Sequence, residues 1–240
     1  MASLNDSTVA SAIGLPVHPF HPLDAIVNDY VENTMSTLTI LAIFASTCVA
    51  ILLPTLLLIR RLRPNLSTGD VSTAMWFIVS GSIHLGLEGY FSINSARMGP
   101  SLTVLGQLWK EYALSDSRYL TQDSFVVCME TVTAFVWGPM CFLCAAAIVL
   151  HHPARHSLQG IISLGQLYGV VLYYATFEYD NVVWGRDYSR PENYYYWGYY
   201  VFLNAFWFFI PVTLILRSAV ASTRAIATVQ RLEAKAGKKN

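Results

Sequence analysis

Five mostly apolar stretches, each about as long as a membrane-crossing helix of roughly 20 residues, restrict what this chain can fold into. Lipid offers the backbone no hydrogen-bond partners, so such stretches form helices when they cross a bilayer. Charged residues make up only 12% of the chain, against about 25% in an ordinary soluble domain, so a separate soluble domain is not expected. The sequence predicts an all-α polytopic membrane protein with five transmembrane helices. They are expected at 36–59, 73–95, 125–150, 158–177 and 195–216.

The positions of Lys and Arg predict the orientation of the chain, because cytoplasmic loops are enriched in these residues. Ten of the fifteen lie on the side that follows the first, third and fifth stretches. We therefore expect a lumenal N-terminal segment (1–35), a five-helix transmembrane domain (36–216) and a cytoplasmic basic tail (217–240). No Lys or Arg precedes Arg60, so the first stretch is expected to act as an uncleaved anchor.

Other features argue against several classes of protein. A formal net charge of zero gives no reason to expect a nucleic-acid partner. The cysteines lie in apolar stretches, where thiols behave as small hydrophobic side chains, and Cys141 and Cys144 lack the surroundings of a redox motif. No zinc signature, phosphate loop or nucleophile elbow occurs in the sequence. The tyrosine-rich segment 194–200 is interpreted mainly as an interfacial aromatic belt.

Polar side chains inside the predicted helices indicate a functional site, because a charge at bilayer depth costs at least about 2.5 kcal/mol. His84 and Glu88 lie four residues apart on one face of the second helix, Glu130 lies in the third and Asn204 in the fifth. At 1.5 Å per residue, the two glutamates come out roughly 10 and 8 Å from the lumenal ends of their helices, and His84 and Asn204 about 15 Å. This agreement in depth predicts one shared internal site.

Structural roles compete with functional ones at these positions. Thr133 and Trp207 each lie three residues after one of the polar side chains and share its helix face. Asn and Thr often form hydrogen bonds between membrane helices, and this role is as well supported for Asn204 and Thr133 as a role in a site. The histidine–glutamate pair is also compatible with a structural bridge, Gln166 with hydrogen bonding between helices, and Trp207 with packing.

Two carboxyl groups and an imidazole in an apolar cavity are suited to proton transfer. Burial favours the uncharged form of a carboxyl group, so one glutamate can keep its proton as an acid while the other acts as a base. A flat apolar molecule entering from the bilayer could then be protonated at one carbon and deprotonated at another. An aromatic face and a carboxylate would stabilise the carbocation between these steps.

At these same residues the chain resembles the emopamil-binding protein family, the membrane Δ8,Δ7-sterol isomerases. The resemblance runs from about residue 76 to residue 215, and its segments occur in the family's order. They are HLGLEGYF (84–91), LWKEYALSDSRYL (108–120), VCMETVTAFVWGP (127–139), GQLYGVVLYY (165–174) and FLNAFWFFIP (202–211).

The resemblance implies five helices enclosing an apolar cavity for a sterol, with no metal or cofactor. Family members move the ring-B double bond from C8–C9 to C7–C8, by protonation at C9 and loss of a proton from C7 through a C8 carbocation. We expect one carboxyl group to act as acid and the other as base, and which does which stays open. The matched motifs imply catalytic roles for His84, Glu88 and Glu130, and substrate-binding roles for Thr133, Asn204 and Trp207.

The resemblance also sets expectations about partners and location. It implies a sterol substrate, lipophilic amines as inhibitors, contact with membrane lipid, a homodimer, and residence in the endoplasmic reticulum membrane. The loop KEYALSDSRY (110–119) is interpreted as a structural network over the cavity mouth. Animal members carry Asp where this chain has Val170, which leaves a carboxylate role in the fourth helix and the substrate preference in doubt.

Two other functions stay open at the level of the sequence. The first is an isomerase that acts on another polycyclic terpenoid, with the same catalytic residues and a different apolar lining. The second is a membrane protein that binds sterols or amines without catalysis, and the joint presence of His84, Glu88, Glu130 and Asn204 argues against it. The sequence does not decide which sterol or terpenoid is the native substrate.

Overall fold

The computed structural model describes residues 18–237. Residues 18–36 contain no helix, the rest is helical outside short connections, and this described part contains no strand. Four helical runs are long and apolar enough to cross a membrane. They are Thr37–Leu62, Ser124–Val149, Arg155–Trp184 and Tyr194–Gly237. The expected all-α class is therefore confirmed, and the chain is a multi-pass membrane protein.

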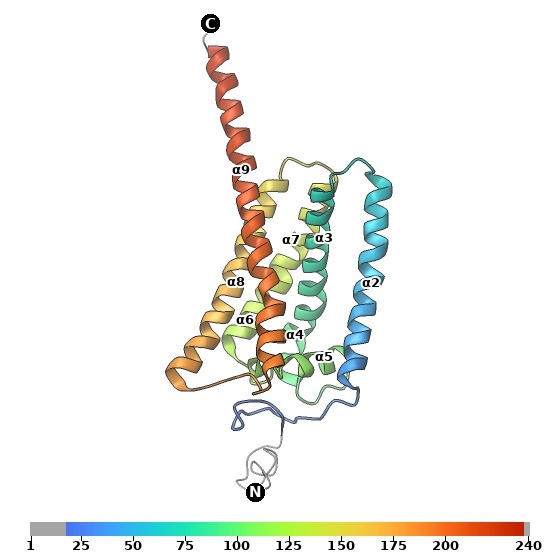
Figure 1. Cartoon of the computed structure of the whole chain (residues 1–240), viewed down its shortest axis with the longest axis vertical. Coiled ribbons are helices and arrows are strands. Elements are labelled where there is room, and N and C mark those ends of the chain that lie inside the picture. Colours follow the sequence, from blue (N-terminus) through green and yellow to red (C-terminus); the bar gives the residue numbers. More distant parts are fainter. Residues whose placement is uncertain (1–17, 238–240) are drawn as a thin grey trace.

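The long helices lie side by side, and the last part of α9 extends beyond the others (Figure 1). Labels with α denote α-helices, and labels with η denote π-helical or 3₁₀ segments. The elements are α2 (Thr37–Leu62), α3 (Thr68–Ser82), η1 (Ile83–Glu88), α4 (Gly89–Asn94), η2 (Ser95–Arg97), α5 (Val104–Tyr112), η3 (Ser117–Tyr119), α6 (Ser124–Val132), η4 (Thr133–Trp137), α7 (Gly138–Val149), α8 (Arg155–Trp184), η5 (Tyr194–Phe202) and α9 (Leu203–Gly237).

Helix α2 stands at the edge of the bundle (Figure 1). Its start is capped by the Ser36 hydroxyl, which accepts a hydrogen bond from the Thr39 N–H, and arginines in its last turn suit the negative end of the helix dipole. Only Ile40 and Ile59 are buried, and its other large apolar side chains are mostly exposed. In a bilayer, lipid would cover that surface.

The second predicted span is not among the four membrane candidates. In its place α3, η1 and α4 follow one another without a break over residues 68–94. This run has the length of a span, but serines, His84 and Glu88 interrupt its apolar character. The expectation of five apolar spans is therefore confirmed for four, and the polar residues that suggested a site explain why the remaining run differs.

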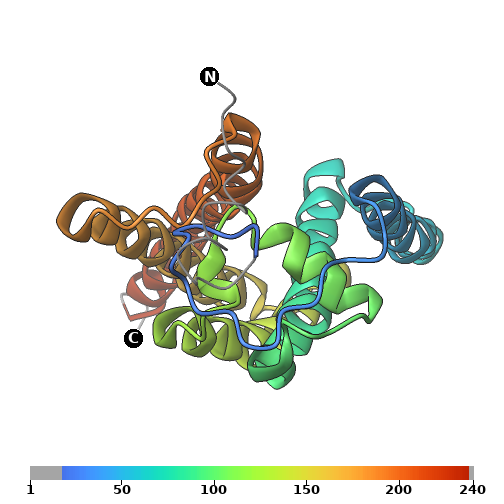
Figure 2. The ribbon, with the colours of Figure 1, turned by 90° about the horizontal axis from the view of Figure 1, so that it is seen from below.

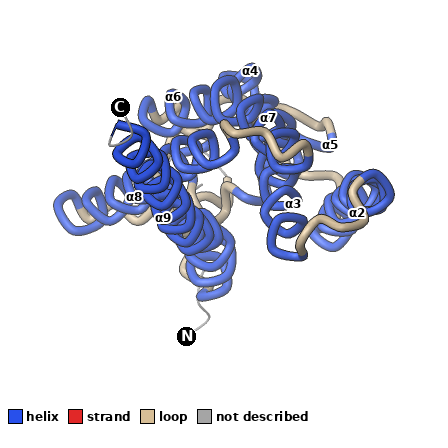
Figure 3. The backbone as a smooth tube through the Cα atoms, turned by 90° about the horizontal axis from the view of Figure 1, so that it is seen from above, coloured by secondary structure: helices blue, strands red, loops and turns tan. Residues whose placement is uncertain are grey.

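The interior helices pack in two pairs, α8 against α9 and α3 against α7, and Figure 3 shows them around a common centre. One close contact joins α8 to η4 at Gly165. A Cβ atom at this position would lie 2.5 Å from Cζ2 of Trp137, closer than atoms can pack. Glycine therefore allows α8 to approach the indole ring.

The segment before α2 closes one end of the bundle, and Figure 2 shows it crossing beneath the helices. Its backbone is held by α5 and η3. The Gln107 side-chain oxygen accepts hydrogen bonds from the N–H groups of Thr34 and Met35, at 2.9 Å each. The Lys110 ammonium donates to the Val31 carbonyl oxygen at 2.6 Å. These bonds order a segment that has no helix of its own.

A buried ion pair lies at the same end of the bundle, and its arginine links this end to α8. The Arg118 guanidinium lies 2.7 Å from an Asp116 carboxylate oxygen and donates to the Thr176 hydroxyl at 2.8 Å. It also lies over the rings of Tyr173 and Phe177. These contacts give the loop of residues 110–119 a structural role, since they tie it to the helices above it.

The fourth and fifth spans are longer than predicted. Helix α8 continues to Trp184 and ends at Gly185, whose φ of 64° is a left-handed conformation that favours glycine. Helix α9 continues through the predicted basic tail as far as Gly237, because residues 212–236 contain no glycine or proline and are rich in good helix formers. Lys238 and Lys239 lie outside the described residues.

Candidate active site

A cavity of about 510 Å³ lies within the helix bundle. Most of its lining is apolar and comes from every long helical run, including Ile40 and Phe44 of α2 and Phe206 of α9. All six predicted site residues lie on its wall, namely His84, Glu88, Glu130, Thr133, Asn204 and Trp207. Side chains from three of the predicted helices therefore line one cavity, and their catalytic and binding roles stay a prediction.

The histidine and the first glutamate form a pair within η1. Nδ1 of His84 lies 2.8 and 2.9 Å from the two carboxyl oxygens of Glu88, and His84 is 2% exposed. The other ring nitrogen, Nε2, lies 3.0 Å from the side-chain nitrogen of Gln166 on α8. An amide nitrogen can only donate, so Nε2 accepts, and the proton of the neutral ring sits on Nδ1 facing Glu88.

The second glutamate is approached by a tyrosine from the loop. The Tyr119 hydroxyl donates to Oε1 of Glu130 at 2.5 Å, and both side chains are buried. Burial, together with the Glu130 carboxylate, raises the pKa of Tyr119 well above its usual value. The phenol therefore keeps its proton and remains a donor. Glu88 and Glu130 lie on the wall of the same cavity, close enough for the charge of each carboxyl group to influence the other.

Asn204 lies beside this cluster rather than in it. Its side-chain nitrogen donates to the Tyr112 hydroxyl at 2.9 Å and to the Tyr200 carbonyl oxygen, one turn earlier, at 2.7 Å. The Thr133 hydroxyl donates to the Met129 carbonyl oxygen at 2.8 Å, which uses its proton within its own helix. In this arrangement both side chains keep an oxygen free to accept a hydrogen bond.

The Trp207 ring closes another side of the site. Its centroid lies 6.1 Å from that of His84 and 5.4 Å from that of Trp76. Its indole nitrogen is buried and has no hydrogen-bond partner among the described residues. The ring face is thus available to a cation or an apolar molecule in the cavity.

Three π-helical segments surround the cavity, and each carries or adjoins a predicted site residue. His84 and Glu88 lie in η1, Thr133 begins η4, and Asn204 follows closely on η5. A π-helical turn inserts an extra residue and changes the direction of the following side chains, and such turns are frequent at functional sites. The hydropathy pattern that predicts a helix does not distinguish it from a π-helical turn.

Sequence reasoning missed Gln166, Tyr119 and Tyr112 as members of the site. Gln166 was interpreted as a contact between helices, and it does form one, but its partner is His84 itself. The two tyrosines belong to α5 and η3, outside the predicted spans, where depth along a helix gives no information. Val170 lies on the cavity wall and is 7% exposed.

The tyrosine-rich segment is only partly an interfacial belt. Tyr194 and Trp197 are more than half exposed, as a belt requires, but Tyr195 and Tyr200 are buried. Tyr199 lies on the cavity wall. Tyr195 and Tyr200 are therefore exceptions to the belt interpretation, and Tyr200 packs against aromatic rings of α8.

The remaining sequence predictions concern cysteines and metals. All four cysteines are free, and Cys141 and Cys144 are buried in the packed interior, as expected for inert thiols. Among residues 18–237, no three His, Cys, Asp or Glu side chains are grouped so as to hold a metal ion.

Fold and cavity together define a multi-pass helical membrane protein in which one histidine and two glutamates lie on the wall of a mostly apolar cavity. Residues 104–218 match the family EXPERA (EXPanded EBP superfamily). The chain is 40% identical over 203 residues to the mouse 3-beta-hydroxysteroid-Delta(8),Delta(7)-isomerase, which covers 84% of this chain and 87% of the mouse protein. The chain therefore belongs to the EXPERA family.

Two further relatives show the range of activities named within this similarity. The rat 3-beta-hydroxysteroid-Delta(8),Delta(7)-isomerase is 40% identical over 202 residues, 84% of this chain and 86% of the relative. Protoglabretal synthase from Citrus sinensis is 34% identical over 145 residues, 59% of this chain and 65% of the relative. The family resemblance seen in the motifs is thus confirmed.

Proposed function

We propose that this protein is a sterol isomerase that moves the ring-B double bond from C8–C9 to C7–C8. The observation that carries the proposal is the cluster of His84, Glu88 and Glu130 on the wall of one apolar cavity. The mouse and rat relatives, each 40% identical over an alignment that covers 84% of this chain, bear the name of this activity. The cavity offers a rigid apolar molecule a largely hydrophobic lining with acid–base groups in one region.

The proposed reaction begins with protonation. The π electrons of the C8–C9 double bond take a proton from the His84–Glu88 pair and form a C9–H bond, which leaves a cation at C8. Glu130 then removes a proton from C7, and the electrons of that C–H bond form the new C7–C8 double bond. The same geometry serves the reaction with the roles of acid and base exchanged.

The contact between the two carboxyl groups supports a simple return of the proton. After one turnover the base has gained a proton and the acid has lost one, so the enzyme must move a proton between them. Direct interaction of Glu88 with Glu130 offers that path within the cavity. Each turnover then ends with the enzyme in its starting state, and the cluster exchanges its proton with water before the next substrate binds.

Trp207 and Asn204 support the intermediate in this proposal. The indole ring next to His84 presents a π face towards the space where the cation forms, and a face of this kind attracts positive charge. The side-chain oxygens of Asn204 and Thr133 accept hydrogen bonds from polar groups that lie near Glu130. These three residues bind and orient the substrate, whereas the histidine and the glutamates exchange protons with it.

The membrane arrangement is part of the proposal. We infer that residues 68–94 cross the bilayer as a fifth span, with the N-terminal segment (1–35) in the lumen of the endoplasmic reticulum and the basic tail (217–240) in the cytoplasm. His84 and Glu88 of this run line the cavity, which keeps them away from lipid. A homodimer is a further proposal drawn from the family.

A second candidate is an isomerase for another polycyclic terpenoid. It is favoured by the similarity to protoglabretal synthase, which extends over 59% of this chain. The acid–base residues would be the same in both cases. The apolar lining and Val170 would set the choice of substrate, since they lie on the cavity wall without contributing a proton.

Sterol profiling tests the proposed function most directly. The chain is expressed in a cell that lacks its own Δ8,Δ7-isomerase, and Δ7-sterols are expected to replace Δ8-sterols. Persistence of Δ8-sterols, although the protein reaches the membrane, contradicts the proposal. Conversion in heavy water should place deuterium at C9, and a product without deuterium there removes the protonation mechanism. Conversion of Δ8-terpenoids supplied to the same cells would distinguish the second candidate from a sterol isomerase.

A further inference from the structure

A second hollow lies at the opposite end of the bundle from α5, where α3 and α8 begin and α9 leaves the other helices. It has a volume of about 580 Å³ and shares no lining residue with the first cavity. Three arginines lie in its wall, whereas the lining of the first cavity contains no Arg or Lys. The lining residues are Ser67, Asp70, Arg155, His156, Leu216, Arg217, Val220, Ala221 and Arg224.

The charges around this hollow are not balanced. Asp70 forms an ion pair with Arg155 and accepts a hydrogen bond from the Ser67 hydroxyl at 2.9 Å. Neither Arg217 nor Arg224 has an ion-pair partner within residues 18–237. Three arginines against one aspartate leave two positive charges around one concave space. A ligand that fits must therefore carry negative charge.

Two polar nitrogen atoms around the hollow are also left without hydrogen-bond partners. Nε of Arg155 and Nδ1 of His156 are buried and have no partner among the described residues. Both residues lie in the first turn of α8, and its N-cap residue, Ala154, supplies no side-chain cap. The positive end of this 30-residue helix therefore faces the hollow without compensation. Arginine forks and a helix N-terminus are the groups that proteins use to bind phosphate.

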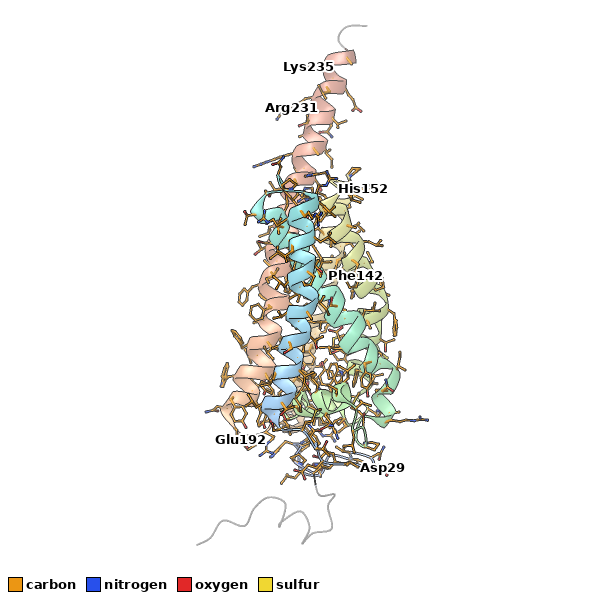
Figure 4. All side chains as sticks on the ribbon, turned by 90° about the vertical axis from the view of Figure 1, so that its right-hand side faces the viewer. Asp29, Phe142, His152, Glu192, Arg231 and Lys235 are labelled. Atoms are coloured by element: carbon orange, nitrogen blue, oxygen red, sulfur yellow. The ribbon has the colours of Figure 1, made fainter. Side chains whose placement is uncertain are left out.

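The position of the hollow identifies the source of such a group. Leu216 is the last residue of the predicted fifth span, and Arg217 follows it directly. In Figure 4 the labelled Arg231 and Lys235 lie farther along α9, on the part that extends beyond the bundle. The hollow thus lies where the apolar spans end, which is the depth of lipid phosphates on the side rich in Lys and Arg.

We propose that this hollow binds the headgroup of an anionic phospholipid, and that the phosphate group of this headgroup occupies the hollow. Arg217 and Arg224 provide the charge, and the first turn of α8 provides donors to the phosphate oxygens. The hydrophobic face formed by Leu216, Val220 and Ala221 lies beside the upper part of an acyl chain. This site is independent of the proposed isomerase activity, because none of its residues lies on the wall of the first cavity.

Native mass spectrometry of the full chain in detergent tests the proposal with short-chain phosphatidylinositol. Phosphatidylcholine serves as a headgroup with phosphate but no net charge. The double variant Arg217→Gln/Arg224→Gln is compared with Arg231→Gln/Lys235→Gln, which removes the same charge from the same helix outside the hollow. Phosphatidylinositol binding should weaken about fivefold for each arginine lost from the hollow and stay unchanged in the control.

Three outcomes overturn the proposal: equal weakening in the two double variants, no weakening in either, or equal binding of phosphatidylcholine and phosphatidylinositol. Equal weakening would show only a general attraction of lipid to a basic tail. Inorganic phosphate added as a competitor separates the two sources of the ligand. Displacement of the lipid supports a site for phosphate itself that a free anion can also fill, and failure to displace it supports a lipid site.

Discussion

The proposed mechanism depends most directly on the side chain of Glu130. It is 5% exposed, accepts a hydrogen bond from Tyr119 and interacts with Glu88. Glu130→Gln preserves its shape but removes the proton that it must gain or lose. We expect turnover to fall by about 10²–10⁴-fold, which is the usual contribution of a general acid or base. Sterol conversion by purified protein with an unchanged melting temperature would check this, and full activity would contradict the role.

Gln166 is expected to act through His84 as a positioning residue. Its amide can donate to Nε2 of the neutral ring, and after rotation its oxygen, which is buried without a partner, can accept from the protonated ring. Gln166→Leu leaves that nitrogen without a partner, at a cost of about 1–3 kcal/mol, or roughly 10- to 100-fold in rate. The lower limb of the pH–rate profile should shift, because the protonated ring loses its acceptor.

Gln159 provides a matched control for this prediction. It lies two turns earlier on α8, is also buried, and donates to the Leu214 carbonyl oxygen at 3.0 Å, away from the cavity. Gln159→Leu should lower stability and leave the pH–rate profile in place. If both leucine variants give the same profile as the unmodified protein, Gln166 has only the role of joining helices.

Lipophilic amines are expected to bind in the cavity, because a protonated amine resembles the C8 cation in charge and shape. Their affinity should depend on Glu88 and Glu130, which attract the ammonium group, and on the Trp207 face. Glu88→Gln and Glu130→Gln should each weaken binding by about tenfold or more, which corresponds to about 1.4 kcal/mol. Calorimetric titration of the two variants provides the measurement, and an unchanged affinity in both contradicts a cation-like binding mode.

At the scale of elements, the site depends on how closely the helices approach each other. Gly165→Ala places a methyl group against the Trp137 ring and must move α8 away from η4. We expect a loss of about 1–3 kcal/mol of stability, as for other overpacked interiors. Gly160→Ala on the same helix is the control, since its Cβ would meet Ser218 at an ordinary 3.6 Å. Thermal unfolding in detergent should separate the two, and equal melting temperatures would show that Trp137 yields easily.

Regular helix geometry predicts which residues of one helix are neighbours, but not which residues of another helix they contact. A strict α-helix predicts that His84 and Glu88 share a face, and the structure shows them hydrogen bonded within η1. It does not predict Gln166 as the third member. That contact depends on the depth at which α8 crosses η1, which the sequence of either helix leaves open.

For the molecule as a whole, the predicted membrane orientation can be tested with a glycosylation acceptor that the chain already contains. Asn5 lies in an Asn-Asp-Ser acceptor for N-glycosylation, within the segment that we place in the lumen. We expect Asn5 to carry a glycan that Asn5→Gln removes. An acceptor sequence added after Asn240 should stay unmodified, because that end is expected in the cytoplasm. Enzymatic removal of glycans followed by electrophoresis shows both, and the reverse pattern contradicts the orientation.

Local sequence patterns were sufficient to predict the class of the protein and most of the candidate site residues. Apolar stretches of membrane length predict helices because lipid leaves the backbone no other way to satisfy its hydrogen bonds. Polar residues inside those stretches stand out because burying them in lipid is costly. These are local properties, readable one helix at a time, and they led to His84, Glu88, Glu130 and Asn204.

Tertiary structure alone decided which groups meet those residues. Tyr119 and Tyr112 reach the site from a loop and a short helix at the end of the bundle, and Gln166 reaches it from α8. The basic hollow likewise joins the beginnings of α3 and α8 with the middle of α9. Such meetings depend on how helices distant in sequence pack, and packing is set by the shapes of all their side chains together rather than by any one stretch.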